Sequence, residues 1–254
     1  MASGTRPWPA PGGPWVMRQT WSDLLFAHWR VPGDLMRDLV PRQLEIDTYD
    51  GSAWIAVVPF LMSGIRFRFL PPIPPTHRTL ELNVRTYVRY GGRPGVYFFS
   101  LDAQSRIIVE AARRWFHLPY HHAEMQMKCA TYTRYESVRA HTGSPDAEFK
   151  AVYRPVSMAD PSAHGSVEYF LTERYCLYSL DPYVRVLVGE IDHRRWPLQR
   201  AEGEFECNTM AQDLGLELRG NPLMHYARSL DVRLWPPVAA ESYSEAFPVL
   251  EQGP

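Results

Sequence analysis

The sequence has 254 residues, and its 27 basic and 28 acidic residues leave a formal net charge of −1. This balance argues against broad binding to nucleic acid or to a membrane surface, because both need a strongly basic face. A hydrophobic fraction of 45% indicates a folded globular protein. No apolar run approaches the ~20 residues of a transmembrane helix.

The sequence predicts a single folded domain between two terminal tails. Residues 1–14 are rich in proline, glycine and small side chains and predict a flexible tail without the apolar core of a signal peptide. From residue 15 to 245 nothing separates two domains, and residues 246–254 are expected to be a C-terminal tail. The three cysteines are widely spaced and form no disulfide or metal-binding pattern, so we expect a cytoplasmic protein.

Most elements are predicted to be strands. Leu24–Val40 has helical periodicity that Pro32 interrupts, which leaves a short helix over Gly33–Leu39. The apolar run Ala53–Leu61 predicts a strand that is buried on both faces. Leu80–Tyr90 alternates over eleven residues, which is a strong strand signal. Further strands are expected within residues 65–69, 95–103, 125–138, 149–156, 184–192 and 229–235.

Helices are expected to be few and short. Gln104–Phe116 suits a helix, although its β-branched centre also suits a strand. Ser166 is a good cap for a helix over Val167–Tyr178, whereas Ala201–Leu214 is ambiguous. The prolines of residues 71–75 predict a stiff loop. Together these patterns predict an α+β fold that is mainly β, as a barrel or a sandwich.

One face of the strand over Leu80–Tyr90 is polar and carries Glu81, Asn83, Arg85 and Arg89. This face suits a solvated sheet surface, which is the simpler interpretation. It equally suits the inside of a barrel, where a carboxylate and guanidinium groups could bind a small acid and move a proton. The alternation alone does not choose between the two.

The segment from Arg113 to Glu124 concentrates histidines and arginines beside aromatic residues. A metal site would use His117 and His121 with a carboxylate. Pro119 opposes the helix that would place these two histidines on one face, so we expect no metal there. The sequence also lacks a P-loop and a G-x-G-x-x-G motif, and no other cofactor is expected. Packing and hydrogen bonding explain the cluster more simply.

Several motifs occur in the order that is found in the YqjF-like family of uncharacterised bacterial proteins, and the chain resembles that family from Trp15 to Trp235. These motifs are TWSDLLFAHWRVP, LEIDTYDGSAWIAVVPF, LELNVRTYV, GVYFFSLDA, ARRWFHLPYHHAEM and HRRWPLQRAE. The family is in turn similar to the acetoacetate decarboxylase-like superfamily. That resemblance implies a β-barrel or cone with an internal cavity and a few flanking short helices.

The same resemblance assigns roles by position. Glu81 stands where the decarboxylases have a cavity glutamate, and Tyr120 stands where they have the lysine that forms an imine. His121 replaces the neighbour that raises the local charge, and Arg114 replaces a second glutamate. Imine formation needs a primary amine, which neither tyrosine nor histidine supplies.

The only two lysines of the chain do not fill that place. Lys128 follows Tyr120 by eight residues, which is ~26 Å along an unbroken strand, and only a sharp bend near Glu124 could bring it back. Lys150 belongs to a later segment that the sequence does not position. A Schiff-base decarboxylase is therefore not expected.

We expect the cavity to bind a small carbonyl or carboxylate compound and to catalyse a proton transfer, such as hydration, isomerisation, cyclisation or hydrolysis. The expected catalytic residues are Glu81, Tyr120 and His121, and the expected substrate-binding residues are Asn83, Arg85, Arg113, Arg114 and His117. A non-catalytic binding or sensor module is the alternative. An assembly partner with an exposed apolar patch is a third interpretation, and homo-oligomer formation stays open.

Overall fold

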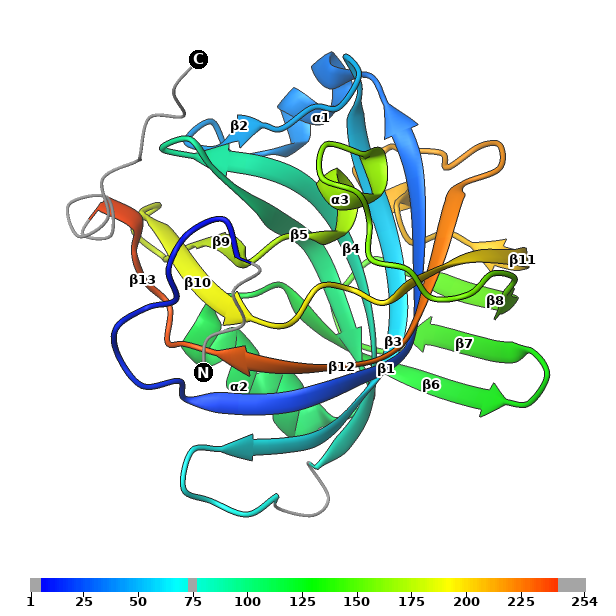
Figure 1. Ribbon diagram of the computed structural model, residues 1–254, viewed down its shortest axis with the longest axis horizontal. Helices are drawn as coiled ribbons and strands as arrows, with labels where there is room; N and C mark the ends of the chain where they lie inside the picture. The colour runs from blue at the N-terminus through cyan, green and yellow to red at the C-terminus, as the bar shows by residue number, and fades with distance from the viewer. Residues whose placement is uncertain (1–5, 73–76, 242–254) are drawn as a thin grey trace.

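The computed structural model describes residues 6–72 and 77–241 (Figure 1). Part of the predicted proline-rich loop, part of the N-terminal tail and the whole predicted tail over 246–254 lie outside the described residues. Within the described ranges the protein is mainly β, with one large sheet and a few short helices. Its strands are β1 (Met17–Val31), β2 (Glu45–Ile46), β3 (Ala53–Phe67), β4 (Arg78–Tyr90), β5 (Arg93–Ala103), β6 (Tyr120–Cys129), β7 (Thr133–Arg139), β8 (Glu148–Pro155), β9 (Cys176–Leu180), β10 (Val186–Asp192), β11 (Leu198–Asn208), β12 (Leu223–Leu234) and β13 (Val238–Ala239).

The helices are short and stand between strands. They are α1 (Gly33–Leu39), α2 (Arg106–Phe116), α3 (Val167–Thr172) and a 3₁₀ turn over Gln212–Leu214. This arrangement is the mainly β fold with a few short flanking helices that the sequence predicts.

The sheet closes on itself twice. Its strands follow the order β13-β10-β9-β5-β6-β7-β8-β11-β12-β1-β3-β4-β2, and β4 also pairs with β5 while β10 also pairs with β12. These two extra pairings make a larger ring through β6, β7, β8 and β11 and a smaller ring through β9 and β10. Strands β12, β1, β3, β4 and β5 belong to both rings.

Sharing of strands explains why the central strands are buried on both faces. Residues Thr79–Val88 of β4 are all buried, and so are residues Ala53–Phe60 of β3. Successive side chains of a strand point to opposite sides. On β3, Val57 packs into the core of the larger ring, whereas Ala56 and Val58 pack into the core of the smaller ring.

Two segments that were expected to be helical contain strands, one over its first half and the other at its C-terminal end. Leu24–Val31 is the second half of β1, where it pairs with both β12 and β3. This segment is apolar on both faces because both rings cover it, and such a run has no period that separates strand from helix. The helix expected over Val167–Tyr178 ends at Thr172, since Cys176–Leu180 pairs with β5 and β10 as strand β9.

Other elements follow the expected pattern with changed boundaries. Gln104–Phe116 resolves as helix α2 and the ambiguous Ala201–Leu214 mainly as strand β11. The expected run over 125–138 divides into the antiparallel strands β6 and β7. Within the described ranges, none of the helices combines the length and the apolar character needed to cross a membrane.

The described part of the predicted N-terminal tail contacts the barrel. Arg6 is ion-paired with Glu190 of β10, and its side chain is 3% exposed. The indole of Trp235 donates a hydrogen bond of 2.7 Å to the carbonyl oxygen of Gly13. Residues 6–14 therefore lie across the end of the smaller ring next to β10 and β12.

Candidate functional site

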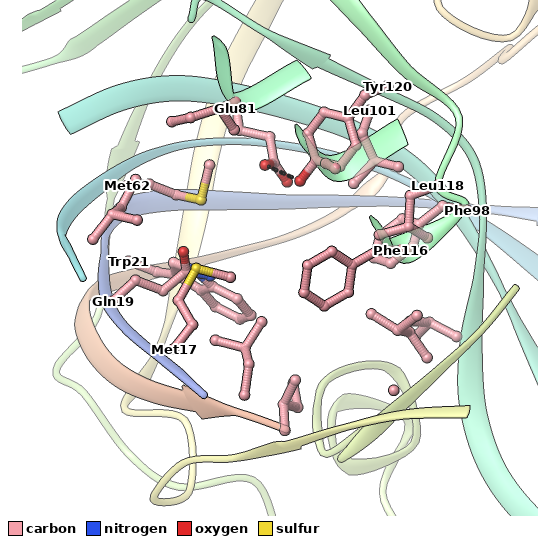
Figure 2. Close-up of a pocket in the computed structure, with 18 of the residues that line it drawn as sticks. Met17, Gln19, Trp21, Met62, Glu81, Phe98, Leu101, Phe116, Leu118 and Tyr120 are labelled. Carbon is pink, nitrogen blue, oxygen red and sulfur yellow. Dashed lines mark hydrogen bonds between the residues drawn. The ribbon is translucent and has the colours of Figure 1, made fainter. Parts of the chain in front are cut away.

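The smaller ring encloses a cavity of about 310 Å³. It is lined by residues of β1, β3, β4, β5, β6, β9, β10, β12, α2 and α3, which are far apart in the sequence. Most of its lining is apolar, and Figure 2 shows aromatic and aliphatic side chains around a small polar group. A cavity of this size, with few polar groups in an apolar wall, is typical of a small-molecule site.

Helix α2 supplies one wall of the cavity. Its first turn is capped by Ser105, whose hydroxyl accepts a hydrogen bond from the backbone N–H of Ile108. Ile108, Ala112 and Phe116 recur every four residues and all face the cavity. The helix ends at His117, which has a left-handed conformation (φ 51°). The residue spacing of α2 thus makes it an apolar cover for the site.

Glu81 and Tyr120 form the polar centre of the cavity. The Tyr120 hydroxyl donates a 2.7 Å hydrogen bond to the Glu81 carboxylate (Figure 2). Strand β5 brings the two together, because it pairs with β4 at Glu81 and, two residues away, with β6 at Tyr120. Both side chains are buried, at 3% and 8% exposure.

Burial sets the electrostatics of this pair. Desolvation raises the pKa of Glu81 to about 7, and the hydrogen bonds from Tyr120 and Asn83 only partly oppose this. Burial and the neighbouring Glu81 raise the pKa of Tyr120 well above its ordinary value. Near neutral pH, Glu81 is therefore divided between its acid and base forms, which suits a group that both accepts and donates a proton. Tyr120 stays protonated and is a hydrogen-bond donor.

Arg85 lies on the same face of β4 as Glu81 and also lines the cavity. Its guanidinium stacks near the rings of Phe26 (5.4 Å) and Tyr87 (5.8 Å). Its Nη2 donates a long hydrogen bond of 3.4 Å to the Leu171 carbonyl oxygen. Arg85 makes no ion pair with any carboxylate of the described ranges. The face that carries Glu81, Asn83 and Arg85 is buried, so the solvated interpretation of it is wrong.

The remaining expected site residues lie around this centre or outside it. Asn83 is buried beside Glu81 but does not line the cavity. Arg113 is exposed and donates a 2.6 Å hydrogen bond to the carbonyl oxygen of Tyr120. Arg114 and His117 are exposed and do not line the cavity.

His121 points to the other side of β6 from Tyr120, as neighbouring residues of a strand do. Its Nδ1 lies 2.8 Å from the Ser144 hydroxyl, outside the cavity. Burial, together with Arg139, His141 and Arg113, lowers the pKa of His121 to about 4. Among the residues that the structure describes, no three histidine, cysteine or carboxylate side chains lie close enough together to ligate one metal ion.

Neither lysine of the chain lines the cavity. Lys128 is exposed near the tip of the β6–β7 hairpin. Lys150 lies on β8 and forms an ion pair of 2.5 Å with Glu148. The cavity, as the described residues line it, therefore contains no primary amine from a lysine side chain.

The cavity also includes residues that the sequence did not single out as functional. Glu190 is buried and ion-paired with Arg6 and Arg93, and Arg174 is ion-paired with Asp47 at 2.6 Å. Two further lining residues, Trp21 and Trp196, have indole N–H groups without a hydrogen-bond partner in the described part of the chain. In the sequence, Trp21 and Trp196 could have been linked to a site only by their positions inside the motifs TWSDLLFAHWRVP and HRRWPLQRAE.

Sequence comparison supports the family resemblance. The model of the DUF2071 family, described as an uncharacterised conserved protein, matches residues 18–231. A relative, the uncharacterised protein YqjF of Bacillus subtilis strain 168, is 48% identical over 229 residues, which cover 89% of this chain and 93% of the relative.

Solved structures support the fold. The enduracididine biosynthesis enzyme MppR, in complex with pyruvate, matches with a TM-score of 0.60 at 12% identity, over 91% of this chain and 93% of that one. An acetoacetate decarboxylase-like enzyme from Sphingomonas wittichii RW1 has a TM-score of 0.58 at 12% identity, over 93% and 98%. The acetoacetate decarboxylase of Legionella pneumophila has a TM-score of 0.56 at 12% identity, over 93% of each chain. At this level of identity the likeness concerns the fold alone.

Proposed function

Because the chain belongs to the DUF2071 family and has an acetoacetate decarboxylase-like fold, we propose that its cavity binds a small carbonyl or carboxylate compound and catalyses a proton transfer on it without an imine. The observation that carries this proposal is the buried pair of Glu81 and Tyr120 in an otherwise apolar cavity. A titratable group with a pKa of about 7 and a fixed hydroxyl donor are the parts that acid–base catalysis needs.

The two groups have complementary roles. Ionised Glu81 removes a proton from carbon next to the ligand carbonyl, or from a water that attacks it. Protonated Glu81 is a weaker hydrogen-bond acceptor than the carboxylate. The Tyr120 hydroxyl then donates its hydrogen bond to the oxyanion that develops on the ligand. Arg85 binds an acidic group of the ligand through its guanidinium.

The absence of a lysine from the described cavity lining supports the non-imine part of the proposal. An imine intermediate needs an amine within reach of the ligand carbonyl, and Tyr120 stands at the position that resembles the decarboxylase lysine. Borohydride reduction in the presence of a keto acid is therefore expected to leave the mass of the protein unchanged.

Proton exchange tests the function directly. The protein is incubated in D₂O with methyl ketones and keto acids, and loss of the α-proton signals is followed by NMR. Wild type is expected to accelerate exchange of at least one compound, and Glu81→Gln to reduce the rate at least about a hundredfold, as general-base losses do. His121→Ala is the matched control, since this residue lies on the same strand as Tyr120 but outside the cavity.

Binding without exchange would support the alternative, a binding or sensor module that kept the cavity. In that case Glu81→Gln and Tyr120→Phe change affinity, while wild type and the variants all leave the α-protons in place. No binding to wild type by either class of compound would contradict both functions.

A further inference from the structure

We propose that Arg85 and the Glu81–Tyr120 pair bind opposite ends of one ligand, an elongated acid whose carboxylate is separated from its reactive carbonyl by an apolar segment. This inference rests on the proposed function, because it uses the same cavity and the same proton-transfer centre. The inference goes beyond the proposed function because it names the class of substrate and excludes short β-keto acids.

The first argument is the charge of Arg85. Its side chain is only 9% exposed, and no carboxylate of the described residues lies within ion-pair distance of it. A buried charge without a partner is costly, so proteins normally pair such groups. The other buried arginines near the cavity illustrate the rule: Arg174 is paired with Asp47 and Arg6 with Glu190. Arg85 differs in facing the cavity without a counter-ion, which an anionic ligand would supply.

The second argument is the hydrogen-bonding character of the groups around Arg85. Within the described ranges its Nε has no partner, and neither has the indole Nε1 of Trp196. Both residues line the cavity and both contact the ring of Phe26, with Trp196 edge-on to it at 4.9 Å. These unpaired atoms are donors only. One unsatisfied guanidinium N–H and one unsatisfied indole N–H, on two residues that pack against Phe26, suit a carboxylate, which only accepts hydrogen bonds.

The third argument is the spacing along β4. Glu81 and Arg85 are four residues apart on one face, which places their backbones ~13 Å apart. The guanidinium lies near Tyr87, which follows Arg85 on that face, and it makes no ion pair with Glu81. In a β-keto acid the carboxylate and the carbonyl are separated by one carbon. Such a compound is too short to reach Arg85 and the Glu81–Tyr120 pair at the same time.

The wall between the two ends is apolar. Phe98 pairs with Arg85 across β4 and β5 and lines the cavity, as does Leu101, two residues before the partner of Glu81. Figure 2 shows Phe98 and Leu101 beside Phe116 and Tyr120. A methylene chain or an aromatic ring along this wall would be removed from water, which favours binding.

A ligand series tests the inference. The probes are methyl ketones that carry a terminal carboxylate, from acetoacetate and levulinate to homologues with progressively longer methylene chains, and the matched methyl ketones without the carboxylate. Affinity is measured by isothermal titration calorimetry with wild type, Arg85→Gln and Trp196→Phe. For wild type, affinity is expected to peak at an intermediate chain length of roughly four to eight methylenes, set by the ~13 Å spacing.

At that length the acid is expected to bind at least about tenfold more tightly than its matched ketone, as a charge-assisted hydrogen bond implies. Arg85→Gln removes this difference and leaves the ketone affinity within about twofold. Trp196→Phe, which keeps an aromatic ring and removes the N–H, weakens the acid more than the ketone and serves if Arg85→Gln does not fold.

Two results would overturn the inference: acetoacetate binding as tightly as every longer acid, or equal losses for acid and ketone in the variants. Failure of the proposed function has a different signature. In that case the long acids bind with the expected dependence on Arg85, but wild type does not accelerate exchange of their α-protons.

Discussion

Two polar regions lie on opposite faces of the neighbouring strands β4 and β5. They differ in how their carboxylate and arginine side chains are paired. In the cavity, Glu81 is hydrogen-bonded to neutral Tyr120, and Arg85 has no carboxylate partner among the described residues. On the other face, Asp102 of β5 and Arg139 of β7 form an ion pair of 3.0 Å with almost no exposure. The charges of Asp102 and Arg139 therefore neutralise each other within the protein. In the cavity, Glu81 and Arg85 form no ion pair with each other.

This difference separates a structural cluster from a site that is open to a ligand. Residue type does not distinguish the two, since both regions contain a carboxylate and an arginine. Burial raises the pKa of Asp102 to about 6 even beside Arg139, so a raised carboxyl pKa also occurs in both regions. What distinguishes them is whether the charges are satisfied within the protein. The following variants test that distinction, beginning with the largest expected effect.

Arg139→Met is expected to cost about 3–5 kcal/mol of unfolding free energy, because it leaves Asp102 buried without its partner. Urea denaturation at pH 7 measures the loss. The affinity of the cavity for its ligand is expected to stay within about threefold, since Arg139 does not line it. A loss below about 1 kcal/mol would mean that the pair contributes no more than a surface ion pair.

Glu81→Gln is expected to make stability less dependent on pH. In wild type the pKa of Glu81 rises from its ordinary 4.5 to about 7 on folding, so the folded state binds more protons between these pH values. Wild-type stability therefore falls as pH rises through this window, by about 3 kcal/mol from this group. The variant lacks that fall, so its stability relative to wild type improves from pH 4.5 to pH 8. A difference that is constant across this range would contradict the assignment.

Tyr120→Phe is expected to destabilise the fold by about 1 kcal/mol and to raise the pKa of Glu81 further. The Tyr120 hydroxyl favours the ionised carboxylate, and its loss leaves desolvation less opposed. The Glu81 titration is followed by carbon-13 NMR of the glutamate carboxyl groups. A fall in the pKa of Glu81 in the variant would show that the hydrogen bond does not favour the carboxylate.

Arg85→Met is expected to have the smallest effect on stability, within about 1 kcal/mol and in the stabilising direction. An apolar side chain of similar length removes an unpaired charge from a buried position. Thermal and urea unfolding without ligand test this, with Arg139→Met as the matched opposite case. A loss of 3 kcal/mol or more would place Arg85 among the structural ion pairs and would remove the basis for an anion at this position.

The sequence predicted many strands because their alternation is a local property. The eleven-residue pattern over Leu80–Tyr90 and the apolar run at Ala53–Leu61 correspond closely to β4 and β3. Segments that are apolar on both faces were harder to assign as strand or helix from the sequence. Leu24–Val31 is a strand without alternation, because both rings of the barrel cover it.

The candidate site was partly predictable. The family resemblance assigned Glu81 and Tyr120 to one site from their positions in the sequence, and the two side chains are hydrogen-bonded in the cavity. It also implicated Arg113, Arg114 and His121, and the histidine-rich segment implicated His117; none of these four lines the cavity. A one-residue step along a strand reverses the side to which a side chain points, so adjacent residues in a short segment cannot be assigned to one cavity from sequence. Trp196 and Arg174 lie between strands, and the long-range pairing of the neighbouring strands places them at the cavity.

By itself, the sequence determined that the protein is rich in strands and that it resembles one family along nearly its whole length. Only the tertiary structure decided that the polar face of β4 is buried and that Tyr120 faces the cavity while His121 does not. It also decided that Arg85 faces the cavity without a carboxylate beside it among the described residues. The physical reason is that burial and charge pairing depend on which distant strands cover a given face, whereas alternation and composition are properties of each segment alone.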